Sequence, residues 1–221
     1  MTIFTTTIYI LLTCFIIGMA YYNTLKKESF YSREETIVLL GDSILKNNEY
    51  VEKGIDEILI ERTEKTYCYA EDGAKIVDVY SQLDRVPFDL NNKLTTVYLS
   101  VGGNNILTHY VDLEQDITDT NILFKLFSSY VILVESIQTK MQESKLVLLD
   151  IYYPQSEEFK KYHSIIREWN NMIYHYAEQN HNEVLKVSQL LTQEGDFSHS
   201  IEPSLQGGEK IVNYILTPYA F

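Results

Sequence analysis

Hydrophobic positions follow two alternating patterns along the chain after residue 35. Short apolar runs bounded by turn or polar residues predict β-strands, and longer runs with helical spacing between them predict α-helices. The predicted strands cover residues 36–40, 66–70, 96–101, 145–152 and 183–187. The predicted helices cover about 48–61, the stretch after Gly73 through Leu83, and then 120–141, 157–178 and 207–216.

This alternation predicts one α/β domain over residues 36–221. Strands and helices that alternate form parallel sheets covered by helices on both faces, so we expect a three-layer α/β/α flavodoxin-like sandwich with a five-stranded parallel sheet. The whole chain has 221 residues, which is room for one such domain and an appendage. Ligand sites in such sheets form in the loops that follow the carboxyl ends of the strands.

The first 25 residues predict a membrane anchor. Residues 2–25 carry no charged side chain and are strongly apolar, and a helix needs roughly 20 such residues to cross a bilayer. A buried core helix would normally show a polar face, which this segment lacks. We therefore expect a transmembrane helix in residues 1–25 and a polar linker in residues 26–35.

The flanks of this segment bear on cleavage and orientation. Gly18, Met19 and Ala20 resemble a signal-peptide cleavage site, but no Lys or Arg precedes the apolar run, which favours an uncleaved single-pass anchor. Lys26 and Lys27 follow it, and the positive-inside rule then favours a cytoplasmic domain over a secreted one.

Charge and cysteine content narrow the possible partners. The formal net charge of -13 disfavours nucleic acids, since affinity for phosphates comes mainly from Lys and Arg. Cys14 and Cys68 are too few for a disulfide framework or a zinc site, and the acidic residues show no metal-ligand spacing. We expect neither a metal nor another cofactor.

Ser43 is the first candidate for chemistry. It follows Gly41 and Asp42 directly after the first predicted strand. A glycine permits a sharp turn there, and the serine can then present its hydroxyl at the edge of the sheet. The same residues are also common in ordinary loops and helix caps.

Two further loops supply hydrogen-bond donors. Gly73 follows the second strand and can turn a backbone N–H toward the same edge. After the third strand come Gly102, Gly103 and Asn104, where a side-chain amide suits a developing oxyanion. This loop lacks the Lys and Ser/Thr of a nucleotide-binding P-loop, and alone it is also typical of a simple turn.

Asp196 and His199 follow the fifth strand. A carboxylate three residues before an imidazole can orient it and stabilise its charged form. A surface-loop histidine is the alternative for His199. The remaining histidines, which we expect to be structural, are His109, His163, His175 and His181.

Taken together, these four loops resemble the SGNH hydrolase superfamily, or GDSL-like esterases and lipases, over most of residues 36–217. The resemblance implies that Ser43 is the nucleophile, His199 the base and Asp196 the residue that orients the base. It also implies an oxyanion hole from the N–H groups of Ser43 and Gly73 and the Asn104 side chain. Looser likeness lies in Ile151, Tyr152, Tyr153 and Pro154 and in Trp169 and Asn170.

The chain departs from the family pattern beside the histidine. Family members usually have proline directly after it, whereas Ser200, Ile201 and Glu202 here separate His199 from Pro203. An alignment without a gap places Glu202 at the histidine position and removes the base. We favour the gapped alignment, because it keeps the family spacing from Asp196 and because imidazole titrates near neutral pH.

The predicted function is therefore serine-dependent hydrolysis of an ester or acyl group, of the esterase, lipase or deacetylase type. The substrate would be a small-molecule, lipid or carbohydrate ester, with the membrane as a second partner. The alternative is a catalytically inactive, membrane-tethered binding module on the same fold, favoured if Glu202 lies against Ser43. A flavodoxin-like signalling domain would leave these loops unexplained.

Overall fold

A computed structural model describes residues 35–114, 116–117 and 119–216. The predicted membrane anchor, residues 1–25, and all of the predicted linker except Glu35 lie outside the described residues.

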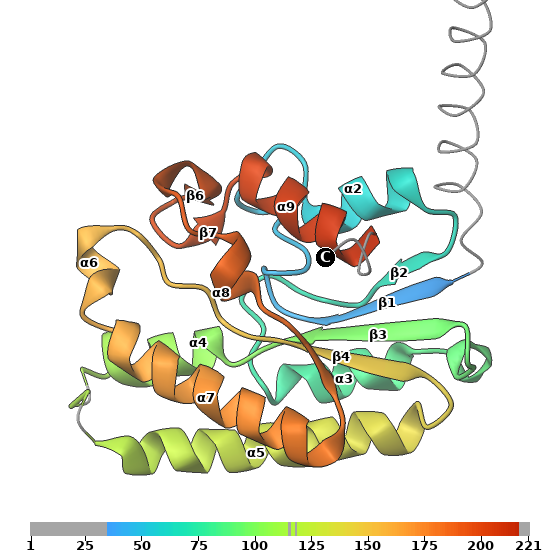
Figure 1. The fold of residues 1–221 in the computed structure, drawn as a ribbon, viewed down its shortest axis with the longest axis horizontal. Helices are drawn as coiled ribbons and strands as arrows, with labels where there is room; N and C mark the ends of the chain where they lie inside the picture. The colour runs from blue at the N-terminus through green and yellow to red at the C-terminus, as the bar shows by residue number, and fades with distance from the viewer. Residues whose placement is uncertain (1–34, 115, 118, 217–221) are drawn as a thin grey trace, which may run out of the picture. The chain divides into compact units, whose positions relative to one another are not determined.

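A five-stranded parallel sheet forms the centre of the described chain (Figure 1). Its strands lie in the order β2-β1-β3-β4-β5, and each neighbouring pair is parallel. This confirms the predicted sheet. The strands are β1 (Thr36–Gly41), β2 (Thr66–Cys68), β3 (Thr95–Ser100), β4 (Lys145–Leu149) and β5 (Glu183–Leu185).

Helices cover both faces of this sheet, as Figure 1 shows. Successive side chains of a strand point to opposite faces, so Val38 and Leu40 pack in the core with α3, α5 and α7, while Ile37 and Leu39 pack with α2 and α9. The three predicted layers are therefore present. The helices named here are α2 (Ile55–Arg62), α3 (Asp78–Arg85), α5 (Thr120–Lys140), α7 (His163–Asn180) and α9 (Leu205–Leu216).

The first helix begins later than its pattern predicts. It was expected from about residue 48, but α2 begins at Ile55, and the chain before it is a turn in which Asn47 has a φ of 68°. The side chain of Asp72 accepts the backbone N–H groups of Asn47 and Glu49 at 2.8 and 2.9 Å. This loop thereby satisfies its backbone through Asp72, which sequence spacing does not reveal.

Short elements account for the other differences. The single helix predicted over 157–178 is two helices, α6 (Glu157–Lys160) and α7. A helix of one or two turns leaves too few apolar repeats to be recognised from periodicity. The unpredicted elements are α4 (Gly103–Ile106), the π-helix η2 (Leu107–Asp112), α8 (Val187–Leu190) and the 3₁₀-helices η1 (Phe88–Leu90) and η3 (Glu194–Asp196).

A small antiparallel hairpin lies just before α9. Its strands are β6 (Phe197–Ser198) and β7 (Glu202–Pro203), and Ser198 pairs with Glu202. At its tip His199 and Ser200 have φ values of 47° and 71°. Because non-glycine residues rarely adopt positive φ, this tight turn determines where the His199 side chain projects.

Helix α5 is the one element among the described residues that is long and apolar enough to cross a membrane. Its apolarity has another explanation, since Leu133, Val134 and Ile137 are fully buried in the core that α5 shares with α7.

Side-chain amides hold the ends of two strands. The Gln82 amide donates to the Gly41 carbonyl at 2.9 Å and accepts the Gly41 N–H at 2.7 Å. Asn170 makes the same pair of bonds with the backbone of Ile151 beyond β4, at 2.7 and 2.9 Å. Both amides are buried, so they satisfy backbone groups that the sheet leaves unpaired where its strands diverge.

Gly41 provides the first test of this arrangement. Its φ is 126°, and an added Cβ would lie 1.7 Å from the Ser100 carbonyl oxygen. Gly41→Ala must therefore push β1 away from β3, and we expect it to lower the free energy of unfolding by more than about 4 kcal/mol in urea denaturation. The control is Gly195→Ala, where the nearest atom to the added Cβ lies at 3.7 Å and little change is expected. Equal effects at both positions would contradict the steric argument.

Candidate active site

Ser43 lies in the turn that follows β1 and is 6% exposed. The turn is pinned to β3, because the Asp42 N–H donates to the Ser100 carbonyl at 2.9 Å, and it closes when the Leu45 N–H donates to the Asp42 carbonyl at 3.0 Å. Ser43 is therefore held at the carboxyl edge of the sheet, where parallel α/β folds form their ligand sites.

Asp42 is a buried carboxyl beside this serine. Its Oδ1 accepts from the Ser100 hydroxyl at 2.8 Å and from the Ile44 N–H at 3.2 Å. The pKa of Asp42 is raised from 3.8 to about 7, mainly by burial and in part by the Glu202 charge, while the hydrogen bonds from Ser100 and Ile44 act in the opposite direction. Near neutral pH this carboxyl is therefore partly protonated.

A cavity of about 60 Å³ opens beside Ser43. The other polar residues that border it are Asp42, Asn104 and Glu202, and the rest of the wall is mainly apolar. It could therefore receive a small apolar group next to the serine hydroxyl. The apolar lining includes Ile44, Ile106, Leu107, Val111, Ile151, Tyr152, Pro154, Phe159, Tyr162, Ile166 and Ile201.

The two predicted oxyanion donors besides Ser43 lie on neighbouring loops. The Asn104 amide donates to the Ala74 carbonyl at 3.0 Å, and since an amide has two N–H groups, the second can donate to a ligand in the cavity. Gly73 precedes Ala74 with a φ of 76°, and it is exposed at the surface. The hydrogen bond to Ala74 thus fixes the Asn104 loop against the Gly73 loop.

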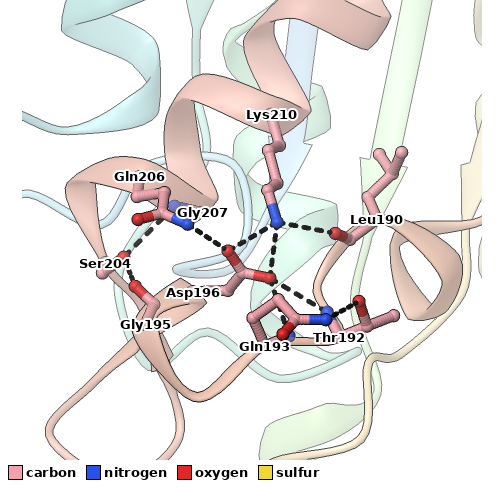
Figure 2. A network of polar contacts seen from close by, with 9 residues as sticks. All are labelled: Leu190, Thr192, Gln193, Gly195, Asp196, Ser204, Gln206, Gly207 and Lys210. Atoms are coloured by element: carbon pink, nitrogen blue, oxygen red, sulfur yellow. Dashed lines mark hydrogen bonds and ion pairs between the residues drawn. The ribbon is translucent and has the colours of Figure 1, made fainter.

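Asp196 is fully buried in a network of donors, shown in Figure 2. Its carboxylate accepts from Lys210 Nζ at 2.7 Å, from Gln206 Nε2 at 3.2 Å and from two backbone N–H groups at 3.0 Å. Burial alone would raise the pKa of Asp196, but Lys210 and the backbone donors outweigh it and hold that pKa below its ordinary value. Asp196 is therefore an ionised anchor between the chain before the hairpin and α9.

His199 lies at the exposed tip of the β6–β7 hairpin. Its ring centroid is 6.1 Å from that of Tyr50, and its charge lowers the pKa of Glu202. Asp196 meanwhile receives its hydrogen bonds from Lys210, Gln206 and the backbone. The hydrogen bonds described for Asp196 thus come from these groups, whereas the prediction has Asp196 orient His199.

Glu202 is the carboxyl that borders the cavity together with Ser43. It is 8% exposed. Burial raises the pKa of Glu202 above its ordinary value and the Asp72 charge contributes to the rise, while Ser43 and His199 lower it. The structure therefore brings Ser43, Asn104 and Glu202 to one cavity, whose lining includes neither His199 nor Asp196.

Several positioning residues were not predicted from the sequence. Asn47 donates its side-chain N–H to the Pro203 carbonyl at 2.6 Å, and Tyr152 donates its hydroxyl to the Ile201 carbonyl at 2.5 Å. Both bonds join residues far apart in the sequence, so no local pattern announces them. Tyr152 alone had a signal, since it belongs to the segment with looser family likeness.

Among the residues that the structure describes, no group of three or more His, Cys, Asp or Glu side chains has a geometry suited to a metal ion. The carboxyls near Ser43 come from separate segments: Asp42 from the turn after β1, Asp72 from the loop after β2 and Glu202 from β7.

Comparison with solved structures shows the same fold in GDSL-like proteins. A member of the lipolytic G-D-S-L family from Veillonella parvula aligns with a TM-score of 0.62 at 18% identity, over 85% of this chain and 98% of the other. A lipase/acylhydrolase from Enterococcus faecalis aligns with a TM-score of 0.62 at 15% identity, over 83% of this chain and 94% of the other.

An acetyl-xylooligosaccharide esterase from Geobacillus aligns with a TM-score of 0.61 at 13% identity, over 87% of this chain and 97% of the other. No family model and no curated protein matches the sequence. The chain therefore has the fold of the GDSL-like lipases, acylhydrolases and esterases, as the sequence resemblance implied. At these identities the likeness establishes the fold and leaves the activity to the site.

The buried Asp42 carboxyl gives the site a measurable pH dependence. Because its pKa is about 7 in the folded protein and 3.8 ordinarily, its contribution to stability is complete below about pH 4 and is lost as the pH rises through 7. Asp42→Asn keeps the oxygen that accepts from Ser100 and Ile44 but carries no charge. We expect its free energy of unfolding to exceed that of wild type increasingly from pH 5 to 8, by up to about 4 kcal/mol. A difference that stays constant with pH would contradict the assigned pKa.

Proposed function

We propose that this chain is a serine-dependent hydrolase of an ester or acyl group, with Ser43 as the nucleophile. The observation that carries the proposal is that Ser43 borders a mainly apolar cavity together with the Asn104 amide and the buried Glu202 carboxyl. An activated nucleophile needs a partner that can take its proton, and an acyl group needs an apolar space beside it.

The same edge offers donors for the oxyanion. The backbone N–H groups of Ser43 and Gly73 and the second N–H of the Asn104 amide are the proposed set. The GDSL-like fold supports this assignment, because the solved structures with this fold include a lipase/acylhydrolase and an acetyl-xylooligosaccharide esterase. For this chain, substrates of that kind, lipid or carbohydrate esters among them, are a proposal, as is membrane attachment through residues 1–25.

The triad implied by the sequence, Ser43 with His199 and Asp196, is the most detailed form of this proposal. It requires the hairpin tip to bring His199 to Ser43 and requires Asp196 to exchange Lys210 for the imidazole. Both carboxylate oxygens of Asp196 accept hydrogen bonds already, so the exchange would leave the Lys210 ammonium without that partner. The geometry favours a role for Asp196 as an anchor.

A binding module without catalysis is the second candidate. It is favoured by the Glu202 carboxyl that borders the cavity with Ser43, where a serine hydrolase would normally carry an imidazole. On this hypothesis Ser43 and Asn104 serve only to bind a polar group of a ligand. It predicts a folded protein that binds an ester or its analogue without turnover.

Labelling of Ser43 separates these candidates. The full-length chain, purified in mild detergent, is treated with a fluorophosphonate probe and assayed on short-chain p-nitrophenyl esters. We expect the probe mass on the peptide that contains Ser43, and we expect Ser43→Ala to remove the label and lower kcat/KM by more than about 10³-fold. A folded wild type that neither labels nor hydrolyses these esters would favour the binding module.

Asn104 tests the oxyanion hole separately from the nucleophile. Asn104→Ala should lower kcat by about 10² to 10³-fold while KM changes little, because the oxyanion develops only in the transition state. The matched control is the neighbouring Asn105, whose side chain accepts from the Ile76 N–H at 3.0 Å. Asn105→Ala should affect stability more than kcat. If the two variants lower kcat equally, the effect comes from the loop and not from a donor to the oxyanion.

A further inference from the structure

Three hydrogen bonds fix the backbone around Glu202. Two come from loops far away in the sequence, and the third joins the two ends of the hairpin. The Asn47 side chain holds the Pro203 carbonyl at 2.6 Å, and the Tyr152 hydroxyl holds the Ile201 carbonyl at 2.5 Å. The Ser204 N–H donates to the Asp196 carbonyl at 2.8 Å. Each residue that flanks Glu202 is therefore tied to a different element, and the position of its side chain is not an accident of a loose loop.

The Glu202 carboxyl has a buried oxygen that is not satisfied. Its Oε2 has no hydrogen-bond partner among the residues that the structure describes, although Glu202 borders the same cavity as Ser43. A buried acceptor without a partner loses its hydration without compensation, and the loss is larger when the group is charged. A buried oxygen without a partner costs stability, so the fold alone does not explain it. Because Glu202 borders the cavity beside a serine, a role toward a ligand or a proton explains it.

The surroundings of Glu202 make it a stronger base than an ordinary glutamate. Burial is the largest cause of its raised pKa, and the negative charge of Asp72 acts in the same direction. The Ser43 side chain and the His199 charge lower the pKa of Glu202 without cancelling the rise. A carboxylate that has lost most of its hydration, and whose free oxygen has no cationic partner, has a higher affinity for a proton.

Other groups around this carboxyl are acidic or neutral. Asp42 interacts with it from the turn after β1, and its pKa of about 7 leaves it partly neutral. Tyr50 lies in the loop before α2 and Tyr152 in the loop after β4. Burial together with the Glu202 charge raises the pKa of each hydroxyl. Among the described residues, His199 is the one cationic group that acts on the pKa of Glu202.

We propose that Glu202 is the general base of the reaction, so that Ser43 and Glu202 form a catalytic dyad in place of a triad with imidazole. This inference rests on the proposed hydrolase function and assigns its missing base. His199 is exposed and takes no part in the proton transfer, and its charge acts only on the pKa of Glu202. Asp196 remains the buried anchor of the hairpin.

The steps balance without another reactant besides water. The Ser43 Oγ forms a bond to the acyl carbon as its proton passes to a Glu202 oxygen, and the carbonyl oxygen takes the negative charge. Collapse breaks the bond to the leaving alcohol, which takes the proton from Glu202. Water then gives its proton to Glu202 as it attacks the acyl-serine, and Glu202 returns that proton to the Ser43 Oγ as the acid leaves.

The test compares Glu202→Gln with His199→Asn in the full-length chain. The substituted glutamine amide keeps the shape and an acceptor for Ser43 but cannot take a proton, so we expect kcat/KM on p-nitrophenyl acetate to fall about 10² to 10⁴-fold and fluorophosphonate labelling to slow in parallel. Asparagine tolerates the left-handed φ at position 199, so His199→Asn keeps the turn. It should keep kcat/KM within a few-fold of wild type.

The pH profile gives a readout that a structural role would not change. The acidic limb of kcat/KM reports the base in the free enzyme. Since the His199 charge lowers the pKa of Glu202, His199→Asn should move that limb to higher pH and leave it present. Glu202→Asp, which keeps a carboxylate, should retain more activity than Glu202→Gln and show its own acidic limb.

Folding and function are separated as follows. Glu202→Gln removes a buried charge, so its melting temperature should equal or exceed that of wild type, and a low activity then reports chemistry. If His199→Asn abolishes turnover while Glu202→Gln retains it, imidazole is the base and this inference is wrong although the hydrolase function stands. If wild type neither turns over ester nor labels at Ser43, both the function and the base assignment fail.

Discussion

The buried carboxylate of Asp196 is the group on which the arrangement of the C-terminal part of the site depends. A charge without solvent must be compensated, and Lys210, Gln206 and two backbone N–H groups do so from both sides of the hairpin (Figure 2). These bonds join the chain before β6 to α9. Once that junction is fixed, the hairpin between them has little freedom, and its second strand delivers Glu202 to Ser43.

The other half of the site depends on the close approach of β1 and β3. Gly41 lies against the Ser100 carbonyl, where no side chain would fit, and the Gln82 amide holds its backbone. The turns that follow the two strands consequently emerge side by side. Ser43 and Asn104 therefore border one cavity although they are sixty-one positions apart in the sequence.

Two carboxyls in this small region give it an unusual electrostatic character. Burial raises the pKa of Asp42 and of Glu202, and the Glu202 charge adds to the rise at Asp42. Both carboxyls therefore hold a proton more readily than exposed carboxyls do. Buried carboxyls lower the stability of the fold and raise the affinity of the site for protons. This combination is expected of a functional cleft and not of a structural core. The exposed imidazole of His199 lies close enough to adjust that balance.

The sequence by itself determined the layers, the five strands and the loops that carry Ser43, Gly73 and Asn104. Those features follow from local periodicity and from glycines after strands, and short-range physics makes them visible in a linear pattern. It also showed that the family spacing beyond His199 is broken, and it left two alignments open.

Only the tertiary structure decided between the side chains that could reach Ser43. The choice depends on the left-handed turn at His199 and Ser200, on the ion pair of Asp196 with Lys210, and on the hold of Asn47 on Pro203. The ion pair and the bond from Asn47 join residues that are distant in the chain. The strength of a buried charge or hydrogen bond is also set by its surroundings. A spacing of three residues can place a carboxylate near an imidazole, but it cannot show that a lysine fourteen residues further on already occupies that carboxylate.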